Sequence, residues 1–396
     1  MRVDNSFPHE PRVAAQSVQM SEPQLMHVIK RFQHACQSGV FPGGQLVVRR
    51  FGKIVVNEAC GIARGYRDTD AMTQLNVTAH TLFPVFSIGK AIAATAIAML
   101  EHRGMLSIDQ RVAEFIPAFH QSDKHDITLL DVLTHRAGII VPALSTREYK
   151  EASRERMLHC LIHTKSLYPR GVLAYAPTEC GIVLCEIIRV LTGKTLATFV
   201  SDDIARPLGL PQLHYGLAHE SIDSVAHSYW LGNKVFMLAG TNFADHFEQT
   251  NNSQLAFNTT NPAYTLVSNA ANLAAFFECL LHQGMSAQQL LPQEKIQQYT
   301  KTQVCGWSNT TRSMMALGLG FQTGMTLFPC AYGYWNTSSC FGHVGCLSSM
   351  AFADHNTGLS VAIVTNGNRS PLAFASLFIP LAHRLRTACS KHHSHH

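Results

Sequence analysis

The sequence predicts an α/β (α+β) fold, in which an antiparallel sheet is built from the N- and C-terminal parts of the chain and flanked by helices, with an inserted mainly helical subdomain. Strand-like runs occur near the start, in "GGQLVVRRFGKIVVNEACGIA", and again beyond about residue 315, in "FGHVGCLSSMAFAD" and "GLSVAIVTN". Helical patterns dominate between them. The chain has 396 residues, of which 46% are hydrophobic and 14% charged, so it can bury the core of one large, two-lobed domain.

The N-terminal elements have clear local signals. The first helix is expected in "SEPQLMHVIKRFQHACQSG", with Ser21 as N-cap and Gly39 as the stop. A hairpin follows, with its turn at residues 51–53. The segment "FSIGKAIAATAIAMLEHRG" is rich in Ala, apolar nearly all round and ended by Gly104. A helix that is apolar on every side is usually buried, so this helix is expected in the middle of the domain.

The later elements are mostly helices, followed by strands. Helices are expected in "ITLLDVLTHRAGI", in "VSNAANLAAFFECLLHQG" and, as a pair, in "ECGIVLCEIIRVLTGKTLATFVSDDIARPLGL". "PLAFASLFIPLAHRLRTA" is expected to close the fold as a helix. The expected parts are a flexible arm at 1–20, a single domain at 21–385 with an α/β lobe at about 21–90 plus 300–388 and a helical lobe at about 91–299, and a disordered tail at 389–396.

Composition excludes several classes of function. The formal charge is +5, with no run of five like charges, so no nucleic-acid partner is expected. The N-terminus has no apolar core of a secretion signal, and no stretch of about 18 uncharged apolar residues occurs, so no membrane association is expected. The 11 cysteines include no C-x-x-C pair, and reduced thiols in a cytoplasmic protein are the expectation.

The stretch "PVFSIGKAIAATAIAML" places Ser87 three residues before Lys90, at the start of the apolar helix. A Ser hydroxyl needs a neighbouring base to become a nucleophile, and residues three apart share a helix face. Burial among Ala side chains favours the neutral form of Lys90, which can then accept a proton. The alternative interpretation is that Ser87 caps the helix and that Lys90 extends to solvent.

A wider resemblance supports catalysis. "LFPVFSIGKAIAATAIAMLEHRGMLSIDQRVAEFIPAF" resembles the nucleophile segment of the serine hydrolases related to class C β-lactamases, a family that holds β-lactamases, D-Ala-D-Ala peptidases, family VIII esterases and lovastatin-type acyltransferases. "FPGGQLVVRRFGKIVVNEACGIA", "DITLLDVLTHRAGI" and "CGIVLCEIIRVLTGKTLATFVSDDIARPLGL" are similar to further family segments in the same order. The resemblance covers about residues 22 to 385 and implies a β-lactamase/transpeptidase-like fold that needs no cofactor.

The family's second motif is Tyr-x-Asn, and "LAYAPTECG" places Tyr175 at the position of its Tyr. The resemblance implies a general base, later an acid, and a lysine beside the phenol is expected to favour its anionic form. Pro177 stands where the Asn is expected, and Thr178 is the candidate to replace it as a substrate contact. The alternative is a tyrosine packed in a Pro-containing loop.

The family's third motif, Lys/His/Trp-x-Gly, matches His343-Val344-Gly345. These residues are expected to line the substrate site, with Gly345 allowing close approach of the backbone to substrate. The N–H groups of Ser87 and Cys346 are expected to form the oxyanion hole. An acyl pocket is expected to be walled by aromatic residues just upstream, Tyr332, Tyr334 and Trp335. The alternatives are a partly buried strand His and aromatic core packing.

Two histidine signals are set aside. His159 and His163 have a spacing that can bind a metal, but the Glu of His-Glu-x-x-His and a third ligand are missing, so no metal site is expected. His135, in "LTHRAG", is expected to make structural hydrogen bonds, since Lys90 and Tyr175 already fill the catalytic role.

These observations predict a serine-dependent esterase or acyltransferase that forms an acyl-enzyme on Ser87. The expected partners are a small-molecule acyl donor, an ester or thioester such as an acyl-carrier or CoA thioester, and a small acceptor. The alternatives are a D-aminoacyl peptidase or β-lactamase of the same family, and a non-catalytic binding scaffold with this fold.

Overall fold

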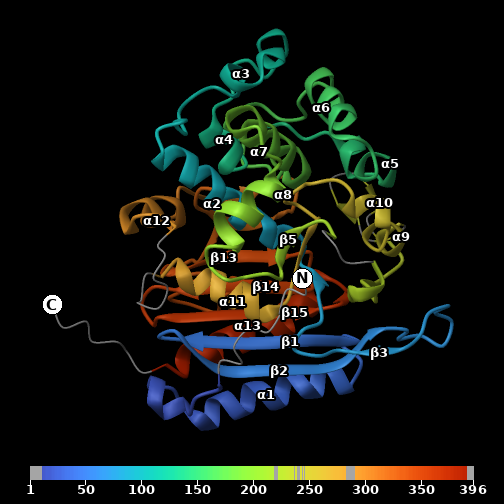
Figure 1. Cartoon of the computed structure of the whole chain (residues 1–396), viewed down its shortest axis with the longest axis vertical. Coiled ribbons are helices and arrows are strands. Elements are labelled where there is room, and N and C mark those ends of the chain that lie inside the picture. The colour runs from blue at the N-terminus through green and yellow to red at the C-terminus, as the bar shows by residue number, and fades with distance from the viewer. Residues whose placement is uncertain are drawn as a thin grey trace, which may run out of the picture.

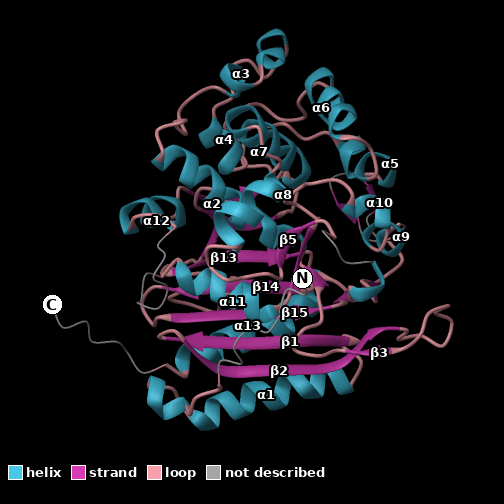
Figure 2. Ribbon diagram, viewed as in Figure 1, coloured by secondary structure: helices cyan, strands magenta, loops and turns pink. Residues whose placement is uncertain are grey.

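In the computed structural model, the described residues are 11–217, 222–235, 237–238, 241–242, 244, 246–281 and 290–389. Within them, nine strands form one antiparallel sheet in the order β10-β11-β12-β13-β14-β15-β1-β2-β3. The strands are β1 (Gly43–Arg50), β2 (Lys53–Arg64), β3 (Leu75–Asn76), β10 (Val304–Ser308), β11 (Ser313–Leu317), β12 (Gln322–Thr323), β13 (Cys340–Gly345), β14 (Ser349–Asp354) and β15 (Leu359–Thr365). The predicted sheet of N- and C-terminal strands is therefore confirmed, because β1 pairs with β15 (Figure 2).

The hairpin that joins β1 to β2 has the expected turn. Arg50 pairs with Lys53, which leaves Phe51 and Gly52 as the two turn residues. Their φ angles are 53° and 74°, the left-handed region that a two-residue hairpin turn with the right-handed twist of a sheet requires. The N–H of Gly52 donates to the Glu278 carboxylate at 2.8 Å, which links the turn to the helix at Ala270–Cys279.

Helices cover both faces of the sheet. The side chains of Leu46 and Val48 share a core with α1 (Glu22–Gln37) and α13 (Pro371–Thr387). Val47, between them, points to the opposite face, where α11 (Ala270–Cys279) packs. This alternation follows from the two-residue period of a strand.

A helical lobe stands on one side of the sheet. In Figure 1, α3, α4, α6 and α7 lie at one end of the molecule and the sheet at the other, with α2 between them. The remaining helices are α2 (Gly89–His102), α3 (Val112–Phe115), α4 (Leu129–Leu133), α5 (Arg147–Lys150), α6 (Arg154–His163), α7 (Pro177–Thr192), α8 (Leu196–Phe199), α9 (Phe247–Asn251), α10 (Gln254–Phe257) and α12 (Gln293–Thr300). Single turns are η1 (Ala15–Val18), η2 (Phe86–Ile88), η3 (Pro117–Gln121), η4 (Pro142–Ser145), η5 (Val200–Ala205) and η6 (Ile222–Ser224).

Short strands connect the lobes. β4 (Phe83–Pro84), β9 (Leu266–Ser268) and β5 (Leu213–Tyr215) form a small sheet, β16 (Gly367–Asn368) pairs with β6 (Tyr229–Trp230), and β7 (Met237–Leu238) pairs with β8 (Thr241–Asn242). β4 leads directly through η2 into α2, so the small sheet holds the start of this helix. Residues 89–100 of α2 are all buried, as its apolar composition predicts.

Two predicted boundaries are wrong. The helical lobe was expected to extend to about 299, but α11 packs on β1, β14 and β15. Leu273, Phe276 and Phe277 of α11 are fully buried, and the Ser360 hydroxyl of β15 donates to the Ala274 carbonyl at 2.7 Å. The apolar helix therefore belongs to the sheet lobe, because its large side chains cover the sheet.

The described part of the expected flexible arm is packed against the sheet lobe. Ala15, Val18 and Met20 are buried, and the buried guanidinium of Arg50 donates to the Val18 carbonyl at 2.9 Å. Met20 also forms a backbone bridge with Cys389, which is buried although it was assigned to the tail. Apolar side chains and backbone pairing thus order residues 11–20 and residue 389. Residues 1–10 and 390–396 of the expected arm and tail lie outside the described residues.

Candidate active site

Ser87 lies at the junction of β4 and α2, in a segment that is otherwise closed to solvent. From residue 82 to residue 100, every residue except Ser87 is buried. The preceding residue, Phe86, has a φ of 50°, a left-handed conformation that is costly for a bulky side chain. This strained turn exposes Ser87 to a cavity of about 550 Å³ that it lines.

Lys90 lies one helical turn below Ser87, as the motif predicts. Its ammonium donates to Oγ of Ser87 at 2.6 Å, and the residue is only 3% exposed. Burial lowers the pKa of Lys90 to about 7, against smaller opposing contributions from Cys180, Cys346 and Glu179. A neutral amine at this position can therefore accept the Ser87 proton near neutral pH.

Tyr175 lines the same cavity, in the loop before α7. Its ring centroid is 5.3 Å from the Lys90 ammonium, and its hydroxyl interacts with Ser87. The prediction that the lysine would favour an anionic phenol is wrong. Burial, the largest contribution, raises the pKa of Tyr175 above its usual value, and the hydrogen bond with Ser87 only partly opposes it. Tyr175 is consequently a neutral O–H donor, and Lys90 is the group whose pKa suits a base.

His135 packs against the ring of Tyr175 and binds the backbone next to it. Its Nδ1 accepts a hydrogen bond from the N–H of Ala176 at 3.1 Å, and its ring centroid is 4.5 Å from that of Tyr175. Burial lowers the pKa of His135 to about 3, so the imidazole is neutral. The structural role expected for His135 agrees with these contacts.

The third motif lies on β13, but only part of it faces the cavity. Val344 lines the cavity, whereas His343 is 1% exposed and donates from Nδ1 to the Val344 carbonyl at 2.7 Å. The ring centroids of His343 and Tyr175 are 6.4 Å apart. The expected substrate contact by His343 is therefore corrected: the alternation of the strand turns its ring into the core beside Tyr175.

Gly345 is required by the packing of β13 against the segment before Ser87. A Cβ at this position would lie 2.2 Å from the Val85 carbonyl oxygen, so the two segments pack backbone to backbone. Cys346 follows with a φ of 43° and lines the cavity beside Ser87. This packing places both backbone segments of the expected oxyanion hole at one cavity.

Pro177 and Thr178 begin α7. Proline suits the first position of a helix, where its missing N–H leaves no hydrogen bond unmade. Thr178 lines the cavity, and its carbonyl accepts from Nδ2 of Asn261 at 3.1 Å. Oδ1 of Asn261 accepts from the N–H of Ala263 at 2.9 Å, and the Ala263 carbonyl accepts from Ser87 at 3.4 Å. The fully buried Asn261, which no sequence signal indicated, thus connects the second motif to Ser87.

The expected role of Trp335 is wrong. Trp335 is 57% exposed, and its ring packs against Tyr334 and His383, with centroids 5.6 and 5.0 Å away. The Trp335 carbonyl accepts from Arg386, which holds this loop against α13. Of the three aromatic residues expected to wall the pocket, Tyr332 is among the residues that line the cavity.

The back of the cavity is formed by α5, α9 and the segment before β9. Its lining residues include Lys150, Asn251, Ala263 and Tyr264. Phe247 of α9 packs on Phe86, with ring centroids 6.2 Å apart. α9 therefore borders both the cavity and the strained turn that carries Ser87.

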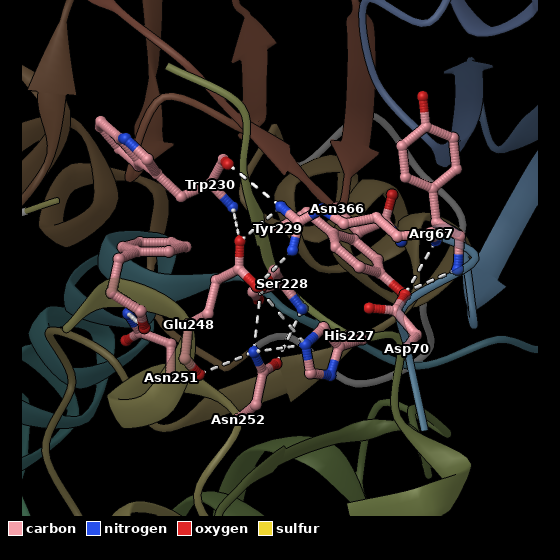
Figure 3. Close-up of polar contacts among 12 residues, drawn as sticks. Arg67, Asp70, His227, Ser228, Tyr229, Trp230, Glu248, Asn251, Asn252 and Asn366 are labelled. Carbon is pink, nitrogen blue, oxygen red and sulfur yellow. Dashed lines mark hydrogen bonds and ion pairs between the residues drawn. The ribbon is translucent and has the colours of Figure 1, made fainter. Parts of the chain in front are cut away.

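A polar network holds α9 in place (Figure 3). Arg67 donates to both carboxylate oxygens of Glu248 at 2.7 and 2.9 Å, and the N–H of Trp230 donates to the same carboxylate at 2.8 Å. Asn252 Nδ2 lies 3.1 Å from His227 Nε2 and donates to the Ser228 carbonyl at 2.9 Å. Figure 3 shows these groups converging on Glu248 and Asn252, so the loop after β2 and the segment leading into β6 position the cavity wall.

Glu179 is the buried acid of the site. It is 3% exposed, lines the cavity and accepts from the N–H of Val141 at 2.8 Å. Burial raises the pKa of Glu179 to about 7, while the hydrogen bond from Val141 and the charge of Lys90 oppose the rise. Like Asn261, Glu179 was not predicted from the sequence, because a carboxylate in the first turn of a helix is commonly exposed to solvent.

The comparison with protein families shows to which family the chain belongs. The family model described as Beta-lactamase matches residues 28–382. The chain belongs to the beta-lactamase family. It is accordingly a serine hydrolase of this family, within the range of esterases, amidases and carboxypeptidases.

Relatives in the beta-lactamase family cover nearly the whole chain. The chain is 24% identical to "Esterase/beta-lactamase LipL" of Mycobacterium tuberculosis, over 94% of this chain and 88% of that protein. A solved penicillin-binding protein homologue from Caulobacter crescentus is 25% identical, with a TM-score of 0.75, and covers 93% of this chain and 98% of its own. A solved family VIII carboxylesterase has a TM-score of 0.74 at 21% identity, covering 92% and 98% of the two chains. These likenesses confirm the β-lactamase-like fold.

The two histidines with metal-binding spacing, His159 and His163, are not among the residues that line the cavity. His159 and His163 are exposed neighbours on α6, with ring centroids 4.2 Å apart. Across the described ranges, no group of three or more His, Cys, Asp or Glu side chains is arranged to hold a metal ion. In the same part of the chain, no helix is long and apolar enough to cross a bilayer.

Proposed function

We propose that the chain is a serine esterase or acyltransferase that forms an acyl-enzyme on Ser87 with an ester or thioester of a small molecule. The observation that carries the proposal is the Ser87–Lys90 pair: a hydroxyl that opens to the cavity lies 2.6 Å from a buried amine whose pKa is lowered to about 7. A cap followed by a solvated lysine would have neither the burial nor the contact.

In the first half of the reaction, neutral Lys90 accepts the Ser87 proton as Oγ attacks the carbonyl carbon. The N–H groups of Ser87 and Cys346 stabilise the oxyanion of the tetrahedral intermediate. The neutral phenol of Tyr175 donates its proton to the leaving oxygen or sulfur, and Lys90 returns a proton to Tyr175. The acyl group is then bonded to Ser87, and the alcohol or thiol has left.

In the second half, water or an acceptor alcohol attacks the acyl-enzyme. Tyr175 and Lys90 relay its proton to Ser87 Oγ, which leaves as the hydroxyl. Water as the acceptor completes ester hydrolysis, and an alcohol completes acyl transfer.

The departure at the second motif favours esters over amides. Pro177 begins a helix and offers no side-chain donor, and the side chain of Thr178 has no amide. An amide substrate would therefore lack the carbonyl contact that an Asn supplies. D-aminoacyl peptidase and β-lactamase activity remain the alternatives within the family.

The proposed partners follow from the same chemistry. The donor is a small ester or thioester, for which an acyl-carrier or CoA thioester is suitable, and no cofactor takes part. We further propose that the enzyme works in the cytoplasm and has neither a membrane nor a nucleic acid as partner. All 11 cysteines are free thiols, which is compatible with a reducing compartment.

Intact-mass spectrometry tests the proposal. The protein is incubated with a panel of activated esters and one β-lactam, and the adduct is mapped by peptide analysis. An ester adduct on Ser87 is expected, absent in Ser87→Ala and retained in Ser201→Ala, a control at an exposed serine of η5. An adduct at another residue, or none with any donor, would contradict the proposal; labelling by the β-lactam alone would favour the family alternative.

A further inference from the structure

The loop that joins β12 to β13 forms one wall of the cavity and carries two apolar side chains that the proposed mechanism does not use. Residues 325 and 329–332 of this loop line the cavity. Between them lie Leu327 and Phe328, which are 82% and 55% exposed. Single exposed apolar side chains are ordinary, but two adjacent ones at the edge of a binding cavity indicate a surface that receives an apolar group. We call residues 324–337 the rim loop.

Hydrogen bonds anchor the base of the rim loop. The Thr337 hydroxyl accepts from the N–H of Met325 at 2.8 Å and donates to the Met325 carbonyl at 2.7 Å. The N–H of Asn336 donates to the Thr326 carbonyl at 3.1 Å. Met325 is buried, so the exposed tip at 327–328 begins two residues after a side chain inside the cavity wall.

Direct contacts connect the rim loop to the turn that carries Ser87. The Tyr332 hydroxyl donates to the Gln322 carbonyl at 3.3 Å, and Gln322 Oε1 accepts from the N–H of Val344 at 3.1 Å. A Cβ on the residue after Val344 would lie 2.2 Å from the carbonyl oxygen of Val85. Val85 precedes Ser87 by two positions, so the wall that the rim loop forms begins beside the proposed nucleophile.

The wall between Ser87 and the tip suits an apolar chain. Val344, Met325 and Ala331 line it with apolar side chains. Among the lining residues that the structure describes in β12 and the rim loop, none is charged. A methionine side chain is unbranched and adapts its shape to what it packs against. An apolar chain can therefore follow this wall without burying a charge, and it meets the tip where it leaves the cavity.

The position of Tyr175 assigns this wall to the acyl chain. Tyr175 belongs to the helical lobe, where its ring centroid is 4.5 Å from that of His135 and 5.3 Å from the Lys90 ammonium. In the proposed mechanism Tyr175 protonates the leaving atom, so the leaving group extends toward the helical lobe. The acyl chain is bonded to the same carbonyl carbon and extends the other way, toward β13 and the rim loop.

From these contacts, and resting on the proposed acyl-enzyme, we propose that the rim loop binds the acyl chain of a medium- or long-chain ester. Met325 contacts the chain inside the cavity, and Leu327 and Phe328 cover it at the mouth. The tip is continuous with the cavity that holds Ser87, which identifies a substrate chain as its occupant. Chain and tip lose exposed apolar surface together, and this burial makes such esters better substrates than acetates.

Two esters with the same leaving group test the proposal. We measure kcat/KM for 4-nitrophenyl octanoate, below its solubility limit, and for 4-nitrophenyl acetate. Spontaneous hydrolysis is subtracted, and the octanoate-to-acetate ratio is taken. The wild type is expected to give a ratio of about ten or more, and the double variant Leu327→Ser/Phe328→Ser is expected to lower it about tenfold.

A matched double variant controls for the loss of exposed apolar surface. Leu167 and Leu255 are 55% and 54% exposed and do not line the cavity. Leu167→Ser/Leu255→Ser is therefore expected to keep the wild-type ratio. Leu327→Ser alone repeats the measurement if thermal unfolding shows that the double variant of the rim loop does not fold.

The possible outcomes are distinct. A wild-type ratio near one, or an equal ratio in wild type and rim-loop variants, overturns the assignment of the rim loop alone. Loss of a dimer in sedimentation velocity with an unchanged ratio assigns the tip to a second copy of the chain, and also overturns it. No hydrolysis of either ester, with no adduct on Ser87, overturns the proposed function instead.

Discussion

The cavity has two buried lysines, Lys90 beneath Ser87 and Lys150 in the back wall. They are similarly buried, but they lie at different distances along the cavity wall from the proposed nucleophile. Lys90 is 3% exposed and Lys150 is 8% exposed, and burial lowers the pKa of both. Each ammonium lies 5.3 Å from the ring centroid of a tyrosine, Tyr175 for Lys90 and Tyr264 for Lys150. Lys90 also donates to the Ser87 hydroxyl at 2.6 Å, and this contact suits it to accept the Ser87 proton.

The largest effect is expected for Lys90→Met. Loss of the proton acceptor should lower kcat/KM for an activated ester such as 4-nitrophenyl acetate by about 10³ to 10⁴. Release of 4-nitrophenol, corrected for spontaneous hydrolysis, gives the rate of each variant. The comparison of the two lysines fails if Lys150→Met lowers this rate as far as Lys90→Met does.

Tyr175→Phe is expected to lower kcat/KM by about a hundredfold, because the leaving oxygen loses its proton donor. An ester with a good leaving group, such as 4-nitrophenol, needs less protonation than an alkyl ester. The loss should consequently be greater with the alkyl ester, as measured by kcat/KM for acetates of 4-nitrophenol and ethanol. Equal losses on the two acetates would show that the phenol does not assist departure of the leaving group.

The smallest effect is expected in the pH profile. Lys90 must be neutral to accept a proton, so kcat/KM should rise with pH through about 7. The Glu179 carboxylate raises the pKa of Lys90, so Glu179→Gln should move this limb to lower pH, by less than about one unit. Gln keeps an acceptor for the Val141 N–H, which makes it a conservative change. A limb that stays in place or moves to higher pH would remove Lys90 as the titrating base.

Local sequence signals predicted the elements that depend on local geometry. The three-residue spacing of Ser87 and Lys90, the turn at Phe51 and Gly52, and the apolar α2 follow from helix and hairpin periods. The sheet was also predictable, because strand patterns at both ends of the chain with helices between them favour one antiparallel sheet built from both termini. These features require no knowledge of what packs against them.

The rest of the site depends on contacts between distant segments. Asn261 joins α7 to the Ser87 turn, and no motif surrounds it. Trp335 follows the cavity residue Tyr332 by three positions, but its carbonyl accepts a hydrogen bond from Arg386 of α13. The pKa of Tyr175 depends on burial more than on the nearby lysine. Spacing along the chain predicts none of these, since each is set by the packed tertiary structure.

The pairing of β1 with β15 has a consequence for biosynthesis. Leu46 pairs with Ile363, so a strand made early in translation must wait for one made near the end. Until then β1 and β2 form a lone hairpin with an apolar face and an open edge, a state that is prone to pair with other chains. Such non-local pairing also slows folding. The sheet that carries the third motif can therefore be completed only after β15 has left the ribosome, and chaperone demand should be highest in the interval before that moment.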